Sequence, residues 1–434
     1  MKKLTFRSGI HIPNNKVRTY SKKIEVFNSD KDFVFPMKST VPCVEIGERV
    51  LVGQRIAEPI DNKGVPAHSS ISGIVKAIER KDVFFGELIE NIVIKNDNKF
   101  ETVNYNSSGN YKSLLAQEII GDIKNAGIVG LGGAAFPTFL KLSPPNINAI
   151  DAIIINGAEC EPYLTCDYRL MVENTHEIIE GARILLHLFP YAKVYIGVED
   201  DKMEAITQLE KMISPSDGGK IIIKKLITKY PQGYEKNLIY SILEREVPVG
   251  KLPLDVGCIV QNVGTIVAIC RAITTGEALI RRVVTVSGAG VRAPKNLEVR
   301  LGTSFREVLK YCDWNEDDTI KIIAGGPMMG SAIIDIDAPI TKGVSGVLCF
   351  TKDAVSFSLQ SNCIRCSKCV NACPMYLLPN MLNQLSIRNK YADFKNYNGM
   401  SCMECGSCTY ICPSKRHLVQ TIRKAKFVIG QTRV

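Results

Sequence analysis

Two short cysteine runs near the C-terminus constrain this chain more than any other feature. Each run has the spacing C-x2-C-x2-C-x3-C-P, and together they use eight of the fifteen cysteines. The runs consist of Cys363, Cys366, Cys369 and Cys373, and of Cys402, Cys405, Cys408 and Cys412. This spacing holds 4Fe–4S clusters in bacterial iron–sulfur proteins, where the fourth cysteine of each run binds the other cluster. The sequence therefore predicts two 4Fe–4S clusters.

Crossed ligation divides the eight thiols into two sets. The predicted sets are Cys363, Cys366, Cys369 and Cys412 for one cluster, and Cys402, Cys405, Cys408 and Cys373 for the other. Zinc is the weaker alternative, because zinc sites pair two C-x2-C hooks and need no third cysteine in each. Disulfides would need an oxidising compartment, and no secretory signal is visible. The seven remaining cysteines are scattered and are interpreted mostly as buried, reduced thiols.

The segment around these runs is expected to be helical. Five apolar residues between the runs recur at helical spacing: Leu377, Leu378, Met381, Leu382 and Leu385. A second apolar stretch, 418–429, follows the last cysteine. We therefore predict a helical ferredoxin-like domain.

Nearly all of the net charge of +10 lies in this C-terminal segment. Residues 361–434 contain eleven Lys or Arg and only two acids, Asp393 and Glu404. Such a surface can offset the negative charge of two clusters, or it can dock on an acidic partner or a membrane surface. Nucleic-acid binding is not expected, because no aromatic-basic platform accompanies the charge. No apolar run approaches the 18 residues typical of a membrane span.

Three regions precede the clusters. Residues 36–95 contain short apolar runs separated by glycines and resemble half of a lipoyl-type barrel; Lys63 lies in the matching turn, but we interpret this region as a scaffold. Residues 115–226 alternate between strands at 152–155, 192–198 and 220–226 and helices at 114–125, 169–189 and 202–213. This order predicts a parallel sheet with a crevice at its carboxyl edge. Residues 281–335 resemble a β-grasp module with a helix at 304–311.

A glycine loop precedes the first of these strands. Gly130, Gly132 and Gly133 belong to a G-x-G-x-x-A match, but the predicted helix before it and Phe136-Pro137 after it differ from Rossmann context. We expect the loop to bring backbone N–H groups close to a phosphate or a flat ring, with Lys141 as a cation. An ordinary glycine turn is the alternative.

The strand at 152–155 runs into Asn156 and two acids, Glu159 and Glu161. Acids at the carboxyl end of such a strand commonly bind the ribose of a dinucleotide. Two solvated carboxylates in a surface turn are the alternative.

These stretches carry a family resemblance. GLGGAAFPTFLK and NGAECEPY resemble the NADH-binding flavoprotein subunit of respiratory complex I. With GIHIPNNK, KYPQGYEKNLI and CPMYLLP, the order along residues 4–425 is closer still to the C subunit of the Rnf complex, a membrane-bound ferredoxin:NAD oxidoreductase that pumps Na⁺ or H⁺.

The resemblance implies a set of cofactor contacts. It places non-covalent FMN on Gly130, Gly132, Gly133, Lys141 and Asn156, and it adds the motif residues Tyr230, Gly233, Glu235, Asn262 and Thr265. It places NAD(H) on Phe136, Glu161 and Glu235. Three positions depart from the complex I pattern: Leu131 for Arg, Ala158 for Asp and Tyr234 for Glu.

The implied organisation is an α/β multidomain protein. The expected units are a barrel-sandwich hybrid domain (1–100), a Rossmann-like FMN/NADH domain (101–270), a soluble-ligand-binding β-grasp domain (271–350) and the ferredoxin domain (351–434). The resemblance implies a peripheral subunit on the cytoplasmic side of the cell membrane. It would exchange electrons with ferredoxin through iron–sulfur and integral membrane subunits. A corrinoid reductase and a non-catalytic electron carrier are the alternatives.

Overall fold

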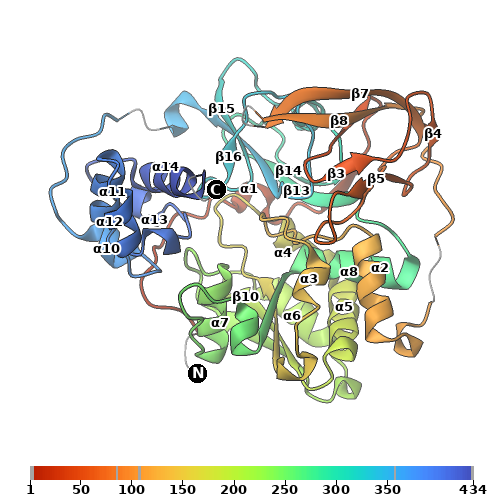
Figure 1. The fold of residues 1–434 in the computed structure, drawn as a ribbon, viewed down its shortest axis with the longest axis horizontal. Helices are drawn as coiled ribbons and strands as arrows, with labels where there is room; N and C mark the ends of the chain where they lie inside the picture. Colours follow the sequence, from red (N-terminus) through yellow and green to blue (C-terminus); the bar gives the residue numbers. More distant parts are fainter. Residues whose placement is uncertain (1–3, 85–86, 106–108, 356–357, 432–434) are drawn as a thin grey trace.

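The structure of this chain, a computed structural model, describes residues 4–84, 87–105, 109–355 and 358–431. Figure 1 shows the helical C-terminal unit at one side of the molecule, beside an α/β unit and two β-rich units. This arrangement agrees with the α/β multidomain class predicted from the sequence.

The α/β unit is built on a four-stranded parallel sheet. Its strands are β9 (Ala152–Gly157), β10 (Lys193–Glu199), β11 (Ile221–Leu226) and β12 (Cys258–Asn262), in the order β11-β10-β9-β12. Ile153 and Ile155 of β9 pack into one core, whereas Ala152 and Ile154 pack into the core on the opposite face. Burial on both faces explains the continuous apolar run of β9, and the predicted parallel sheet is confirmed.

Helices cover both faces of this sheet. They are α2 (Ala116–Asn125), α3 (Thr138–Lys141), α4 (Cys166–Glu173), α5 (Thr175–Leu188), α6 (Met203–Met212), α7 (Glu235–Leu243) and α8 (Val263–Thr275). The single helix expected at 169–189 is wrong, because the chain leaves helical geometry at Asn174 (φ −113°, ψ 30°). Asparagine is a weak helix former, and here its side chain donates to the carboxylate of Glu177 in the first turn of α5.

Two small sheets form the N-terminal barrel-like unit. One has the order β2 (Phe33–Pro36), β8 (Glu87–Asn96), β7 (Gly73–Phe84), β4 (Arg49–Val50), and the other has the order β3 (Thr40–Pro42), β5 (Arg55–Pro59), β6 (Ala67–His68). Phe33, Ile56 and Ile92 are fully buried between them. The β-rich prediction for residues 36–95 is confirmed.

A six-stranded sheet forms the second β-rich unit. Its order is β1 (Ile24–Phe27), β14 (Lys295–Arg300), β13 (Arg281–Ser287), β17 (Gly346–Thr351), β15 (Thr319–Ala324), β16 (Ser331–Ala332), and helix α9 (Phe305–Tyr311) packs in its core. Strand β1 comes from the N-terminal segment and pairs in parallel with β14. No local pattern in the sequence predicts that pairing.

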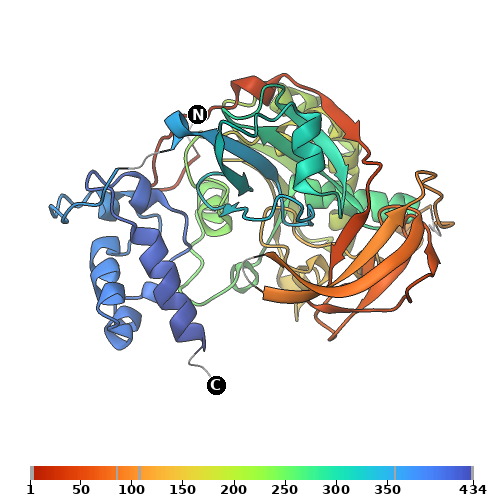
Figure 2. The same ribbon diagram turned by 90° about the horizontal axis from the view of Figure 1, so that it is seen from above.

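Residues 4–20 cross several units, and we call them the N-terminal strap. Leu4 bridges to Leu226 of β11, and Ile10 bridges to Tyr230. Arg18, in α1 (Val17–Tyr20), donates to the carbonyls of Gly288 and Val291, both at 2.7 Å. Figure 2 shows the strap passing between the C-terminal helices and the rest of the molecule.

The C-terminal unit is helical, as predicted. It contains α10 (Lys368–Ala372), α11 (Pro379–Ile387), α12 (Tyr391–Asn396), α13 (Ser407–Tyr410) and α14 (Leu418–Gln431). Leu382 of α11, Phe394 of α12 and Ile422 of α14 share one core. Among the described residues, no helix is long and apolar enough to cross a membrane.

Candidate functional site

The carboxyl ends of β9 and β12 meet where the strand order reverses. Strands β10 and β11 lie on one side of β9 and β12 lies on the other, and Asn156 lies opposite Asn262 in the register. Open parallel sheets bind ligands in the crevice outside such a point, because the loops leave the two strands in opposite directions. The two asparagines therefore mark the rim of the candidate site.

The glycine loop lies against the end of β12. It follows α2 and precedes α3, so it does not have the strand-to-helix context of a Rossmann fingerprint. The Leu131 N–H donates to Thr265 Oγ1 at 2.9 Å, which fixes the loop on the first turn of α8. A Cβ placed on Gly132 would lie 3.5 Å from the Cβ of Asn262, so the loop and strand end touch.

The outer part of this loop leaves its donors free. Gly133 has φ +117°, where glycine is unstrained. In the described part of the chain, the N–H groups of Gly132, Gly133 and Ala134 donate no hydrogen bond. Consecutive free backbone N–H groups beside a helix N-terminus fit a phosphate, and so this loop fits a flavin mononucleotide.

Lys141 lies beside the same end of β12. Its Nζ lies 3.3 Å from Glu235 Oε2 and 3.3 Å from the carbonyl of Val260. On the other strand, Asn156 Nδ2 donates to the carbonyl of Gly233 at 2.8 Å. The structure thus brings together ten of the candidate residues from four separate segments: Gly130, Gly132, Gly133, Phe136, Lys141, Asn156, Gly233, Glu235, Asn262 and Thr265.

Glu159 is occupied by protein groups. Its carboxylate accepts the N–H groups of Asp167 (2.7 Å) and Tyr168 (3.3 Å) at the start of α4, and its side chain is 3% exposed. Lys16 of the N-terminal strap lies 3.8 Å away and donates to the Glu159 carbonyl. Glu159 is therefore held inside the unit, where it orders α4.

Asp167 is a site residue that the sequence did not reveal. Its carboxylate accepts Asn262 Nδ2 at 2.7 Å, while Asn262 Oδ1 accepts the N–H of Gly264 and caps α8. Burial, with the neighbouring Glu159, raises the pKa of Asp167 to about 7. An acid in the first turn of a helix is common, so no signal in the sequence distinguishes it.

The side chains of Glu161 and Tyr230 point out of the α/β unit. Glu161 contacts the unit with the six-stranded sheet, and Tyr230 contacts the helical C-terminal unit. The Glu161 carboxylate accepts the N–H groups of Met328 (3.0 Å) and Met329 (2.9 Å), and burial raises its pKa to about 7. The Tyr230 hydroxyl donates to the carbonyl of Cys405 at 2.7 Å, and Tyr230 is 1% exposed. The α/β unit therefore contacts a residue of the second cysteine run directly.

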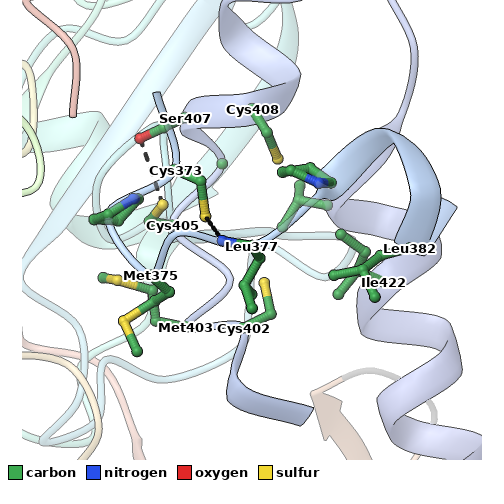
Figure 3. A pocket seen from close by; sticks show the side chains of 14 residues that line it. Cys373, Met375, Leu377, Leu382, Cys402, Met403, Cys405, Ser407, Cys408 and Ile422 are labelled. Atoms are coloured by element: carbon green, nitrogen blue, oxygen red, sulfur yellow. Dashed lines mark hydrogen bonds between the residues drawn. The ribbon is translucent and has the colours of Figure 1, made fainter. Parts of the chain in front are cut away.

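The eight cysteines of the two runs line two hollows. We call the set Cys373, Cys402, Cys405 and Cys408 the inner set, and the set Cys363, Cys366, Cys369 and Cys412 the outer set. Figure 3 shows the inner set facing one space, with the Leu377 N–H directed at Cys373 Sγ (3.4 Å) and the Cys405 thiol donating a hydrogen bond to Ser407 Oγ (3.4 Å). Each hollow thus combines three cysteines of one run with the last of the other.

The spacing of these sulfurs suits clusters better than single ions. Among the described residues, the only three Cys, His, Asp or Glu ligand atoms within 4.8 Å of one another are those of Glu159, Cys166 and Asp167. Four thiolates around one zinc ion, each about 2.3 Å from the metal, would lie closer than that. Burial raises the pKa of Cys402 to about 11, and a bound metal centre would deprotonate such a thiol.

Comparison with known proteins adds relatives of nearly full length. The C subunit of the proton-translocating ferredoxin:NAD(+) oxidoreductase complex of Clostridium ljungdahlii is 44% identical over 430 residues, which covers 97% of this chain and 93% of the relative. The C subunit of the Na(+)-translocating complex of Acetobacterium woodii is 40% identical, with 99% and 98% covered. The chain belongs to the RnfC family, the C subunits of Rnf complexes.

Four family models match successive parts of this RnfC chain. They describe an RnfC barrel-sandwich hybrid domain (residues 4–99), a Nuo51 FMN-binding domain (123–271), an SLBB domain (283–332) and a 4Fe-4S dicluster domain (357–413). The predicted fold classes, FMN and the two 4Fe–4S clusters are thereby confirmed.

Two further comparisons give matches of smaller coverage or lower identity. The C subunit of the ion-translocating oxidoreductase complex of Vibrio cholerae is 37% identical over 87% of this chain, which spans only 49% of that relative. The structure of an NAD+-reducing [NiFe]-hydrogenase in the air-oxidized state superposes with a TM-score of 0.52 at 18% identity, covering 72% of this chain and 63% of the other. At that identity the likeness concerns the fold alone.

Proposed function

We propose that this chain is the peripheral NADH- and FMN-binding iron–sulfur subunit of a membrane-bound Rnf complex. It passes electrons reversibly between ferredoxin and NAD⁺, while partner subunits couple the transfer to Na⁺ or H⁺ movement. The observation that carries this proposal is the contact of Tyr230 with Cys405, because it joins the nucleotide-binding unit to a cysteine of the inner set. Flavin chemistry is needed here, since a nicotinamide exchanges two electrons and a cluster exchanges one.

The residues take separate roles in this proposal. The flavin site consists of Gly130, Gly132, Gly133, Lys141, Asn156, Gly233, Glu235, Asn262 and Thr265, and Tyr230 joins this site to the inner set through its bond to Cys405. Phe136, Glu161 and Glu235 serve the nicotinamide nucleotide, and Glu159 supports α4 beneath the site. The inner and outer cysteine sets each hold one 4Fe–4S cluster. No side chain takes the part of a catalytic acid or base in the hydride exchange.

The chain's own groups prepare the site for these ligands. Free N–H groups of the glycine loop and Lys141 favour a phosphate, while the bond from Asp167 fixes the amide of Asn262. Tyr230, Ile10, Ala372 and Cys405 share one small core, which excludes water between the inner set and the α/β unit. Electrons would then enter at the outer set and pass through the inner set to the flavin.

We propose the units 1–100, 101–270, 271–350 and 351–434 as the functional domains. This peripheral protein would lie on the cytoplasmic side of the membrane, bound to integral membrane and iron–sulfur subunits. The named relatives are subunits of ion-translocating complexes, and no feature of the residues that the structure describes favours a corrinoid reductase.

Cofactor analysis of the full chain, purified without oxygen, tests the proposal. We expect about eight iron atoms per chain, together with bound FMN that NADH reduces. A chain without flavin and without NADH oxidation would contradict the proposal. Affinity purification from its native cells gives a second test, because integral membrane subunits should accompany the chain, whereas a cobalamin enzyme would identify a corrinoid reductase.

A further inference from the structure

A buried arginine from the β-grasp unit lies behind the glycine loop. Arg282 is the second residue of β13, and its side chain is directed at the neighbouring α/β unit. Its Nη2 donates to the carbonyl of Leu131 at 3.2 Å, and its Nη1 donates to the carbonyl of Lys342. Arg282 is 5% exposed, and desolvation lowers its pKa.

The segment after β16 closes the same side of the loop. Lys342 Nζ donates to the carbonyl of Gly127 at 2.6 Å, and burial lowers its pKa to about 8. A Cβ placed on Gly343 would lie 3.1 Å from the carbonyl oxygen of Gly133, so this segment touches the glycine loop. Two cations and one tight backbone contact therefore form a wall behind the loop.

Neither cation is neutralised by a direct ion pair. Within the described residues, Arg282 and Lys342 donate to backbone carbonyls only. The acid that interacts with Arg282 is Asp167, which acts through space and itself carries a raised pKa. Burying an arginine without a carboxylate partner is costly, so a nearby anion would stabilise it.

Arg282 also determines which groups of the loop remain available. The N–H of Leu131 donates to Thr265 Oγ1, and the carbonyl of Leu131 accepts from Arg282. Both backbone groups of Leu131 are therefore held from behind the loop. The free N–H groups of Gly132, Gly133 and Ala134 follow directly. Positive charge behind a row of free N–H groups favours a dianion in front of it.

We propose that Arg282, assisted by Lys342, is a positioning residue that makes the glycine loop select the phosphate of a phosphorylated flavin. This inference rests on the proposed flavin site and adds a residue of the β-grasp unit to it. A purely structural Arg282 would join two units through backbone carbonyls without affecting which flavin is bound.

FMN and riboflavin distinguish these two roles, because they differ only in the phosphate. The full chain, with its clusters in place and its flavin removed, is titrated with each flavin by fluorescence quenching. In Arg282→Gln we expect FMN affinity to fall about tenfold or more while riboflavin affinity changes little. Arg282→Lys keeps the charge and should retain most of the preference for FMN.

Arg281→Gln is the matched control. Arg281 is the preceding residue of β13, and it pairs with Glu277 and Glu298 instead of the loop. The Arg281→Gln chain should prefer FMN over riboflavin as strongly as the wild type does. If Arg282→Gln does not fold, Lys342→Met provides the same comparison, with a smaller expected loss of FMN preference.

Three results would overturn the inference. Equal losses for FMN and riboflavin in Arg282→Gln would show a structural role, and loss of preference in Arg282→Lys would exclude charge as the cause. A wild-type chain that binds riboflavin as tightly as FMN would show that the loop does not recognise phosphate. A wild-type chain that binds neither flavin would refute the proposed flavin site itself, and this outcome differs from the other three.

Discussion

The inner and outer cysteine sets share one ligand pattern but lie in different surroundings. The inner set touches the α/β unit through Tyr230, and Gly9 of the strap donates to the carbonyl of Ala372 beside it. The outer set includes the exposed Cys366, and the exposed Lys368 and Lys415 lie next to its ligands in the sequence. The proposed function would use this difference, with the inner cluster facing the flavin and the outer cluster facing a partner.

The inner and outer sets also differ in the charged groups near them. Exposed cations lie near the ligands of the outer set in the sequence, whereas the inner set lies near Glu161, a carboxyl buried against the loop of Met328 and Met329. Exposed cations attract an acidic partner from a distance, and this attraction weakens with salt. Buried groups instead change the reduction potential of the metal centre beside them.

Removing single ligands gives the largest expected effect. Cys405→Ala should destroy the inner cluster and Cys366→Ala the outer one, so that iron falls to about half in each. NADH should still reduce the remaining inner cluster of Cys366→Ala, but it should not reduce the outer cluster of Cys405→Ala. Iron analysis and electron paramagnetic resonance after NADH addition measure both.

The crossed assignment has its own control. Cys412→Ala should resemble Cys366→Ala, and Cys373→Ala should resemble Cys405→Ala, because each run contributes its last cysteine to the other hollow. If Cys412→Ala instead removed the cluster affected by Cys405→Ala, the runs would bind their clusters without crossing.

Charge reversal at the outer set should have the next largest effect. Lys368→Glu with Lys415→Glu should slow electron transfer from an acidic iron–sulfur donor by about tenfold at low salt, because steering by exposed charge is lost. The difference in rate between the double variant and the wild type should shrink as the salt concentration increases. Stopped-flow measurements of cluster reduction test this, and NADH reduction of the flavin should be unaffected.

Lys395→Glu with Lys424→Glu serves as the control for that experiment. Lys395 on α12 and Lys424 on α14 are both exposed and neither lines the outer hollow, so this double variant changes the net charge by the same amount. If it slowed the donor as much as Lys368→Glu with Lys415→Glu, the net charge of the unit would matter and not the position of the cations.

Loss of the Tyr230 hydroxyl should affect only electron transfer to the inner cluster. Tyr230→Phe removes one buried hydrogen bond to Cys405, which contributes about 1 kcal/mol to the contact between the units. We expect NADH-driven reduction of the inner cluster to slow by a few-fold while FMN content stays constant. Tyr376→Phe, an exposed tyrosine of the C-terminal unit, is the control. Unchanged inner reduction in Tyr230→Phe would show that this contact does not set the transfer.

The sequence predicted what depends on local spacing. The C-x2-C-x2-C-x3-C-P runs predicted the helical cluster unit, and continuous apolar runs predicted the parallel strands of the α/β unit. The contact of Tyr230 with Cys405, the pairing of β1 with β14 and the bond from Arg282 to Leu131 join residues more than 100 positions apart. No spacing rule connects such residues, because their meeting depends on how the finished units pack. The break at Asn174 was missed for a different reason: the apolar periodicity continues across it.

Asp167→Asn should have the smallest effect on electron transfer, because it changes the stability of the α/β unit instead. The unfolded carboxyl loses its proton near its ordinary pKa, whereas burial and Glu159 raise the folded pKa to about 7. Between these values the folded state binds more protons, so stability falls as the pH rises through this window, by about 1–3 kcal/mol. Asparagine keeps an oxygen for Asn262 and cannot ionise, so the variant should unfold at higher urea than the wild type at pH 8 and similarly at pH 4. The exposed Asp393→Asn is the control, and equal pH profiles for all three chains would show that Asp167 ionises normally in the folded state.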